Sequence, residues 1–161
     1  MEKKLLKTHS CENKTILLIN KQTISLRKGD KIKLGKRCLD NYEYIMGIDF
    51  IEDISHWCLL FVCFKTCKIF YLDPLTNDNK YELTLVFKNV TKYLSSFKDF
   101  KEKTCKISDL CYTHTCQYDT ISCGVYVCFF VEKLVKRQKE LLSDHVYTNE
   151  YRNFIKDFLI N

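Results

Sequence analysis

The sequence predicts an α+β fold with a small sheet and about three helices. A near-continuous apolar run over 57–64 and a second run over 68–72 predict two buried strands joined as a hairpin. Apolar residues spaced by three and four between Leu83 and Phe97 predict an amphipathic helix. A further run, 123–136, is apolar on nearly all sides and basic at its C-terminal end, which is typical of a helix that enters the core.

The rest of the chain carries shorter patterns. Residues 14–55 predict short strands and turns, and Asp73-Pro74 ends the second hairpin strand because proline cannot donate to a central ladder. The other expected elements are strands at 15–19 and 44–48, a turn at 28–30, strand-like runs at 104–107 and 112–117, and an amphipathic helix between Tyr147 and Leu159.

Length and composition predict one globular domain over residues 1–161. A chain of this size buries roughly 70% of the surface that its unfolded form would expose. Its 46% of hydrophobic and 29% of charged residues are typical of folded proteins. No apolar stretch is long enough to span a bilayer, and the N-terminus lacks the features of a secretory signal. We therefore expect an intracellular protein, cytoplasmic or nuclear, that does not associate with membranes.

The ten cysteines bear on metal binding, and the net charge of +6 bears on the class of partner. No Cys-x-x-Cys pair occurs, so the sequence predicts no metal site, and most thiols are expected to be reduced and buried. The lysines are spread along the chain without a dense basic block, which disfavours nucleic acid as a partner. A mildly basic surface suits an acidic protein partner. We expect a monomer.

His56 and Asp73 stand at the two ends of the predicted hairpin. If the turn lies near Lys65 and Thr66, the two side chains fall at its open end, opposite or diagonal to each other. Such positions are ~4.5–8 Å apart, within reach of a hydrogen bond between imidazole and carboxylate. That bond would fix the tautomer of the histidine and stabilise its charged form. Alone, this spacing is only moderately specific.

Cys123 is expected at the first turn of the core helix, where backbone N–H groups and the helix dipole favour a thiolate. Ser122 occupies the N-cap position. Gly124 would let a substrate backbone pass close to the sulfur. Gln117 can donate its amide N–H to a developing oxyanion, together with the backbone N–H of Cys123. A base, a carboxylate, an amide and a thiol in this order suit a cysteine nucleophile.

The remaining histidines and cysteines are interpreted as structural. His114 lies in an alternating segment, and we expect it on the solvent face. Cys58 shares a strand face with His56 and is expected to pack there, with a resolving thiol as the alternative. Cys128, on the core helix, is expected in the core.

Three motifs occur together in the second half of the chain. They are His-Trp before a strand, Leu-Asp-Pro-Leu after the next strand, and Gln-x-Asp-x-x-Ser-Cys-Gly-Val-Tyr-Val-Cys. These motifs resemble the Ulp1/SENP family of ubiquitin-like-protein-specific cysteine proteases and, more distantly, the adenovirus-type protease. The match covers about residues 54–135. It implies a papain-like or adenain-like core, in which a small mixed sheet and flanking helices surround the helix that bears the nucleophile.

The resemblance also implies roles for single residues. His56 would be the general base and acid, and Asp73 the group that orients it. Cys123 would be the nucleophile and Gln117 the oxyanion donor. Trp57 would lie beside the narrow channel that admits a C-terminal Gly-Gly tail. The resemblance implies neither a cofactor nor a metal.

The sequence departs from the family pattern at three places. Ser122 stands where the family usually has aspartate before the nucleophile. Residues 1–55 lack the usual Trp-Leu-Asn-Asp type motif, so this half is divergent or abbreviated. Trp57 is the only tryptophan, so a second aromatic wall over the channel must be a tyrosine or phenylalanine.

The sequence thus predicts a thiol protease or isopeptidase that cleaves after the C-terminal Gly-Gly of a ubiquitin-like modifier, with a SUMO-type modifier as the first choice. Its partners would be the modifier or its conjugates. Three alternatives stay open: an acyltransferase on the same triad, a catalytically weak protein that binds a modifier, and a viral or transposon maturation protease.

Overall fold

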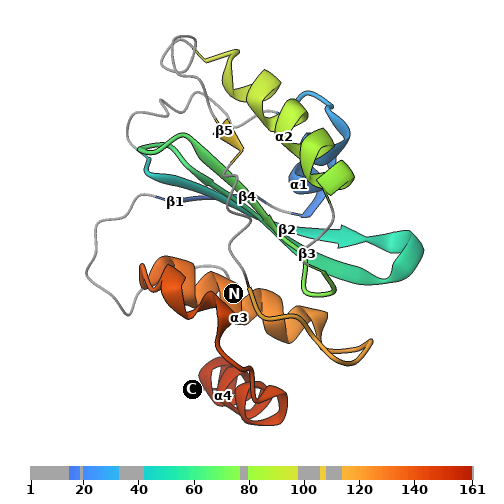
Figure 1. The fold of residues 1–161 in the computed structure, drawn as a ribbon, viewed down its shortest axis with the longest axis vertical. Helices are drawn as coiled ribbons and strands as arrows, with labels where there is room; N and C mark the ends of the chain where they lie inside the picture. Colours follow the sequence, from blue (N-terminus) through green and yellow to red (C-terminus); the bar gives the residue numbers. More distant parts are fainter. Residues whose placement is uncertain are drawn as a thin grey trace.

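The structure, a computed structural model, describes residues 15–18, 20–32, 42–76, 80–97, 106–107 and 114–160. Its centre is a five-stranded sheet in the order β1-β2-β3-β4-β5 (Figure 1). The strands are β1 (Thr15–Leu18), β2 (Tyr44–Ile51), β3 (His56–Cys63), β4 (Lys68–Leu72) and β5 (Lys106–Ile107). The pairs β2–β3 and β3–β4 are antiparallel, and each edge strand runs parallel to its neighbour. The sheet is therefore small and mixed, as predicted.

Helices cover both faces of this sheet. They are α1 (Asn20–Lys28), α2 (Lys80–Leu94), α3 (Cys123–Val135) and α4 (Thr148–Ile160), with short 3₁₀ turns η2 (Glu52–Ile54) and η4 (Lys139–Ser143). α1 and α2 lie on one face, α3 lies on the opposite face, and α4 lies beyond α3 (Figure 1). The α+β fold is confirmed. Within the described ranges, every helix is too short or too polar to cross a membrane.

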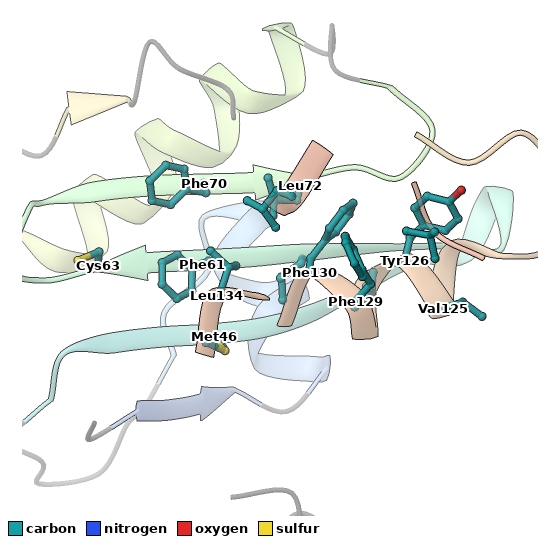
Figure 2. Close-up of a cluster of buried hydrophobic side chains, with 14 residues drawn as sticks. Met46, Phe61, Cys63, Phe70, Leu72, Val125, Tyr126, Phe129, Phe130 and Leu134 are labelled. Atoms are coloured by element: carbon teal, nitrogen blue, oxygen red, sulfur yellow. The ribbon is translucent and has the colours of Figure 1, made fainter. Parts of the chain in front are cut away.

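The central strand β3 supplies side chains to two separate hydrophobic cores. Cys58, Leu60 and Val62 belong to the core beneath α1 and α2. The intervening Leu59 and Phe61 belong to the core beneath α3, which Figure 2 shows in close-up. Successive side chains of a strand point to opposite faces, and a strand covered on both faces can be apolar throughout. This burial explains the unbroken apolar run in the sequence.

The hairpin of β3 and β4 forms as predicted, with its turn at residues 64–67. Cys67 has a positive φ of 48° in this turn. Its Sγ lies 3.6 Å from the carbonyl oxygen of Phe64, to which it donates. The turn places the start of β3 and the end of β4 at the same end of the sheet, and this end carries the candidate site.

Helix α1 corrects the expectation of only strands and turns in residues 14–55. Its sequence is mostly polar, and only Thr23 and Leu26 are buried. Leu26 enters the core, and the side chain of Asn89 on α2 donates to the carbonyl oxygen of Arg27 at 2.6 Å. Gly29 then ends the helix with a φ of +84°. With so few buried residues, the helix has no amphipathic pattern that could be recognised in the sequence. Contacts with distant elements stabilise it instead.

A buried ion pair also joins α1 to the sheet. Arg27 Nε lies 2.6 Å from Asp49 Oδ2, and the Asp49 side chain is fully buried. The Tyr71 hydroxyl donates to the same oxygen at 2.8 Å. Burial, and next the nearby Cys58 and Asp49, raise the pKa of Tyr71 far above its usual value, so this hydroxyl remains a donor. The network fixes α1, β2 and β4 relative to one another.

The run expected as strand-like at 112–117 is irregular over its described part, 114–117. Two backbone hydrogen bonds hold it. Thr115 N–H donates to Leu142 O, and Gln117 N–H donates to Pro74 O, both at 2.8 Å. The second bond ties this segment to the residue after Asp73.

Candidate active site

His56 and Asp73 form the hydrogen bond that the hairpin predicts. His56 Nε2 lies 2.6 Å from Asp73 Oδ1, and the two residues are only 3% and 7% exposed. The register pairs Leu59 with Leu72. Continued by one residue, it puts Asp73 opposite Cys58 and therefore diagonal to His56, a separation that these side chains can bridge.

A second donor fixes the Asp73 carboxylate. Leu75 N–H donates to Oδ1 at 2.8 Å, and Asp73 forms an isolated bridge with Thr76. An ionised carboxylate only accepts hydrogen bonds, so His56 Nε2 carries the proton that it donates. The neutral ring then has its lone pair on Nδ1. The pair is therefore oriented so that Nδ1 can accept a proton.

Cys123 is the first residue of α3 and is 5% exposed. The helix dipole places partial positive charge at this end of α3. Val125 N–H and Tyr126 N–H both donate to the carbonyl oxygen of Ser122. In the described part of the chain, no hydrogen bond occupies the backbone N–H of Cys123, which leaves it available to a ligand.

Ser122 does not cap α3 with its side chain, contrary to what its N-cap position suggests. Its hydroxyl instead donates to Asp119 Oδ2 at 2.6 Å. Asp119 Oδ1 accepts from the N–H groups of Ile121 and Ser122, at 2.9 and 2.7 Å. These bonds, with the Ser122 hydroxyl as the largest cause, lower the pKa of Asp119. An ionised carboxylate thus shapes the turn that leads into Cys123.

Arg152 of α4 completes this arrangement. Its Nη2 donates to the Ser122 hydroxyl oxygen at 2.9 Å. In the sequence analysis Asp119 occurs in the Gln-x-Asp motif without an assigned role, and Arg152 has none. An aspartate three residues before a serine at a helix start is a recognisable turn signal, and it could have indicated Asp119. Arg152 lies 30 residues from Ser122 in the chain, and no local pattern points to it.

Gln117 lies next to this turn and is mostly buried. Its Nε2 donates to the carbonyl oxygen of Asp119 at 2.5 Å. A side-chain amide has two hydrogens, so the second remains for another acceptor. The backbone bond from Gln117 to Pro74 brings this amide to the end of the hairpin that carries Asp73.

A pocket of about 570 Å³ opens beside Cys123. Its lining residues are Ser55, Trp57, Thr120, Ile121, Cys123, Gly124, Val125, Cys128, Arg152 and Ile155. Trp57, half-buried, packs its ring on Phe50 with centroids 4.4 Å apart. Ser55 and Trp57 directly flank His56 in the chain, so the pocket lies at the start of the hairpin. Within the described residues, no hydrogen bond joins Cys123 to His56.

Two expectations about other residues are wrong, and one is confirmed. His114 is not on the solvent face: it is 5% exposed and stacks on Phe130 with centroids 5.1 Å apart. Burial lowers the pKa of His114 to about 4, against an opposing effect of the Asp73 charge. Cys128 is exposed at the pocket rather than in the core. Cys58 is fully buried, as expected.

One group of possible metal ligands occurs in the described part of the chain. The nearest ligating atoms of His56, Cys58 and Asp73 all lie within 4.8 Å of one another. The 2.6 Å hydrogen bond between His56 and Asp73 already occupies two of these atoms. The cluster therefore belongs to the histidine–carboxylate pair described above.

Comparison with solved structures gives the same fold. The chain is similar to a structure of the SUMO protease Ulp1 with its catalytic cysteine oxidised to a sulfinic acid, at 22% identity and a TM-score of 0.56. That match covers 73% of this chain and 51% of the other. It is also similar to the C-terminal Ulp1 protease domain in complex with Smt3, the yeast ortholog of SUMO, at 18% identity and a TM-score of 0.62. This second match covers 84% of this chain and 62% of the other, so the chain spans roughly half to three-fifths of these structures.

Comparison of sequences completes the assignment. No curated protein matches the chain. The profile of the Ulp1 protease family, C-terminal catalytic domain, matches residues 4–156, nearly the whole chain. Because this match covers far more than half of the chain, the chain belongs to the Ulp1 protease family.

Proposed function

We propose that this chain is a cysteine protease whose reacting groups are Cys123, His56 and Asp73. The buried bond between His56 Nε2 and Asp73 Oδ1 is the observation that carries the proposal. It leaves Nδ1 as the basic atom of the ring. Cys123 lies at the start of α3, and its pocket also contains the two chain neighbours of His56. The proposed reaction requires the Cys123 sulfur and the His56 ring to come into contact in the substrate complex, and catalytic contacts often tighten only around substrate.

The reaction begins with transfer of the Cys123 proton to His56 Nδ1. The thiolate then attacks the scissile carbonyl, and the carbonyl oxygen becomes an oxyanion. The second amide hydrogen of Gln117 and the backbone N–H of Cys123 are the donors for that oxyanion. His56 returns the proton to the leaving amine as the C–N bond breaks, which leaves an acyl-enzyme. Water, deprotonated by His56, attacks the thioester and releases the acid and the thiol.

As substrate we propose the C-terminal Gly-Gly tail of a ubiquitin-like modifier, in a precursor or in an isopeptide conjugate, with a SUMO-type modifier as the first candidate. Membership of the Ulp1 family supports this class, as does the likeness of the fold to a Ulp1 domain bound to Smt3. Trp57 and Gly124 support it locally, since both line the pocket beside Cys123. A glycine tail would lie flat between an aromatic ring and a residue without a side chain.

Electrophilic modifiers test this proposal. SUMO, ubiquitin and NEDD8, each with a C-terminal vinyl sulfone, are incubated with the protein, and adducts are located by intact mass and peptide mapping. We expect a single adduct with SUMO, at Cys123, and none in Cys123→Ser. Cys128→Ser is the matched control, because Cys128 lines the same pocket and its loss should leave labelling unchanged. Modifier that binds without labelling Cys123, or labelling that persists in Cys123→Ser, would contradict hydrolysis by this site.

A further inference from the structure

The pocket beside Cys123 contains one charged side chain, that of Arg152. Its other lining residues are apolar, hydroxyl-bearing or thiol-bearing. We propose that Arg152 binds a carboxylate of the substrate, so that an aspartate or glutamate close to the scissile bond is preferred. This inference rests on the proposed protease function and adds a specificity-determining residue to it.

The guanidinium is held in place before any ligand arrives. Nη2 donates to the Ser122 hydroxyl oxygen at 2.9 Å, and Nη1 lies 3.4 Å from Asn149 Oδ1. The Ser122 hydroxyl is itself fixed by its bond to Asp119. Guanidinium has five N–H donors, so three remain for a ligand. A planar guanidinium fixed on one side presents the geometry that matches a carboxylate.

The charge of Arg152 is not cancelled by a direct ion pair. In the part of the chain that the structure describes, no carboxylate lies within ion-pair distance of its guanidinium. Asp119 is its indirect partner through Ser122, and the Asp119 oxygens accept from Ile121 and Ser122 instead. Ser122, directly before Cys123, stands where the family usually has an aspartate. As a serine, it brings no negative charge to Arg152. The Asp119 charge still acts on Arg152 through space, and this attraction, after the hydrogen bonds from Ser122 and Ile121, contributes to the lowered pKa of Asp119. The Asp119 carboxylate lies beyond ion-pair distance, however, so part of the attraction for an incoming anion is retained.

The surroundings of Arg152 suit an acidic side chain on a peptide. Ser55 and Thr120 offer hydroxyl groups around the same pocket, and Ile121 is 75% exposed at its rim. The hydroxyls can donate to carboxylate oxygens, and the isoleucine can contact the methylene groups of aspartate or glutamate. Because Ser122 holds Arg152 and directly precedes Cys123, the bound carboxylate would lie within a few residues of the reacting carbonyl.

Two small alkylating reagents test the charge preference without any modifier. Chloroacetyl-aspartate amide and chloroacetyl-asparagine amide have nearly the same size and the same reactive group, and differ by one negative charge. Rates of alkylation at each cysteine are followed by peptide mapping. We expect Cys123 to favour the aspartate reagent by about tenfold. We expect the ratio to approach 1 in Arg152→Gln, to reverse in Arg152→Glu, and to shrink with added salt.

Two controls separate recognition from folding. Arg137→Glu makes the same charge change at an exposed arginine that pairs with Glu43 at the other end of α3, and the ratio at Cys123 should not change. Ser122→Ala keeps the charge of Arg152 but removes its tether, and should lower the ratio partially. An equal ratio in the wild type and Arg152→Gln would overturn the inference. The proposed function would still stand in that case if modifier probes label Cys123, so the two failures are distinguishable.

Discussion

Two histidines lie near the Asp73 carboxylate, and their surroundings give them different chemistry. His56 donates to Asp73 directly and is thereby oriented. His114 stacks on Phe130, and burial holds its pKa near 4. The ring of His114 is therefore neutral at neutral pH and is a packing group. Asp73 thus orients one histidine through a direct hydrogen bond, while burial keeps the other histidine neutral.

The buried His114 predicts a loss of stability in mild acid. Its pKa is about 4 in the folded protein, against an ordinary 6.5, so the unfolded chain binds more protons between these values. The contribution is complete above pH 6.5 and falls with pH through this window. We expect a loss of about 2 kcal/mol in the free energy of unfolding from pH 7 to pH 5. Urea unfolding at the two pH values measures it.

The matched comparison for this measurement is His114→Gln against His145→Gln. His145 is exposed, so its substitution should leave the pH dependence unchanged. His114→Gln should make the free energy of unfolding less dependent on pH over this range. Equal dependence in the two variants would show that His114 is protonated in the folded protein as readily as in the unfolded chain.

For contacts between single side chains, spacing in the sequence predicts some and misses others. The hairpin register carries His56 and Asp73 together, because a short turn determines which residues face each other. Arg152 reaches Ser122 only because α4 packs beyond α3, and the distance of 30 residues between them leaves no periodic signal. The burial of His114 likewise involves a residue from another part of the chain, Phe130, on which its ring stacks.

One contact between helix α1 and strand β2 is especially close. A Cβ built on Gly47 would lie 2.4 Å from the Oγ1 atom of Thr23, which is fully buried. Glycine is therefore required at this position by the approach of the helix, not by an unusual backbone angle. The contact fixes how near α1 can lie to the sheet.

We expect Gly47→Ala to destabilise the protein by about 1–3 kcal/mol, because the added methyl group overpacks this contact. Thr23→Ala removes the opposing atoms, so the double variant should recover most of the loss. Urea unfolding of the two single variants and the double variant gives the coupling energy directly. Strict additivity of the two substitutions would contradict the proposed contact.

Gly124→Ala is the control at the element scale. Its new methyl group would lie 3.9 Å from Trp57 Cδ1, an ordinary van der Waals distance. Alanine is also the better helix former at the first turn of α3. The urea midpoint of this variant should therefore equal or exceed that of the wild type. A loss as large as that of Gly47→Ala would show that overpacking does not explain the effect at Gly47.

Elements with strong periodicity are the ones that the sequence predicts well. β3 and β4 follow from their apolar runs, and α2, α3 and α4 begin and end within a few residues of the predicted bounds. Helix α1 was missed, since its nine residues are mostly polar and only Leu26 enters the core. Its helical form depends on the ion pair with Asp49 and the contact with Gly47, which no local pattern encodes.

In the whole molecule, the sheet separates two hydrophobic cores of the described chain. The candidate site lies where the end of the sheet that carries His56 and Asp73 meets the start of α3. Cys58 packs on the side of α1 and α2, and Leu59 packs on the side of α3. The sheet supplies His56 and Asp73, and the helix supplies Cys123. Because both cores share one sheet, we propose that residues 1–161 form one domain. In this proposal β1, α1 and β2 belong to the N-terminal half, residues 1–55, which is divergent or abbreviated relative to the family.

The proposed reaction depends most on the cooperation of His56 with Cys123 across these two elements. The rate of alkylation of Cys123 by chloroacetamide, measured by peptide mapping in the wild type and in His56→Ala, tests it without assuming a substrate. We expect Cys123 to react fastest among the cysteines, and to slow by about tenfold or more in His56→Ala. The half-buried Cys67, in the hairpin turn, serves as internal reference and should keep its rate. An unchanged rate at Cys123 in His56→Ala, with Cys67 also unchanged, would contradict the proposed role of the histidine.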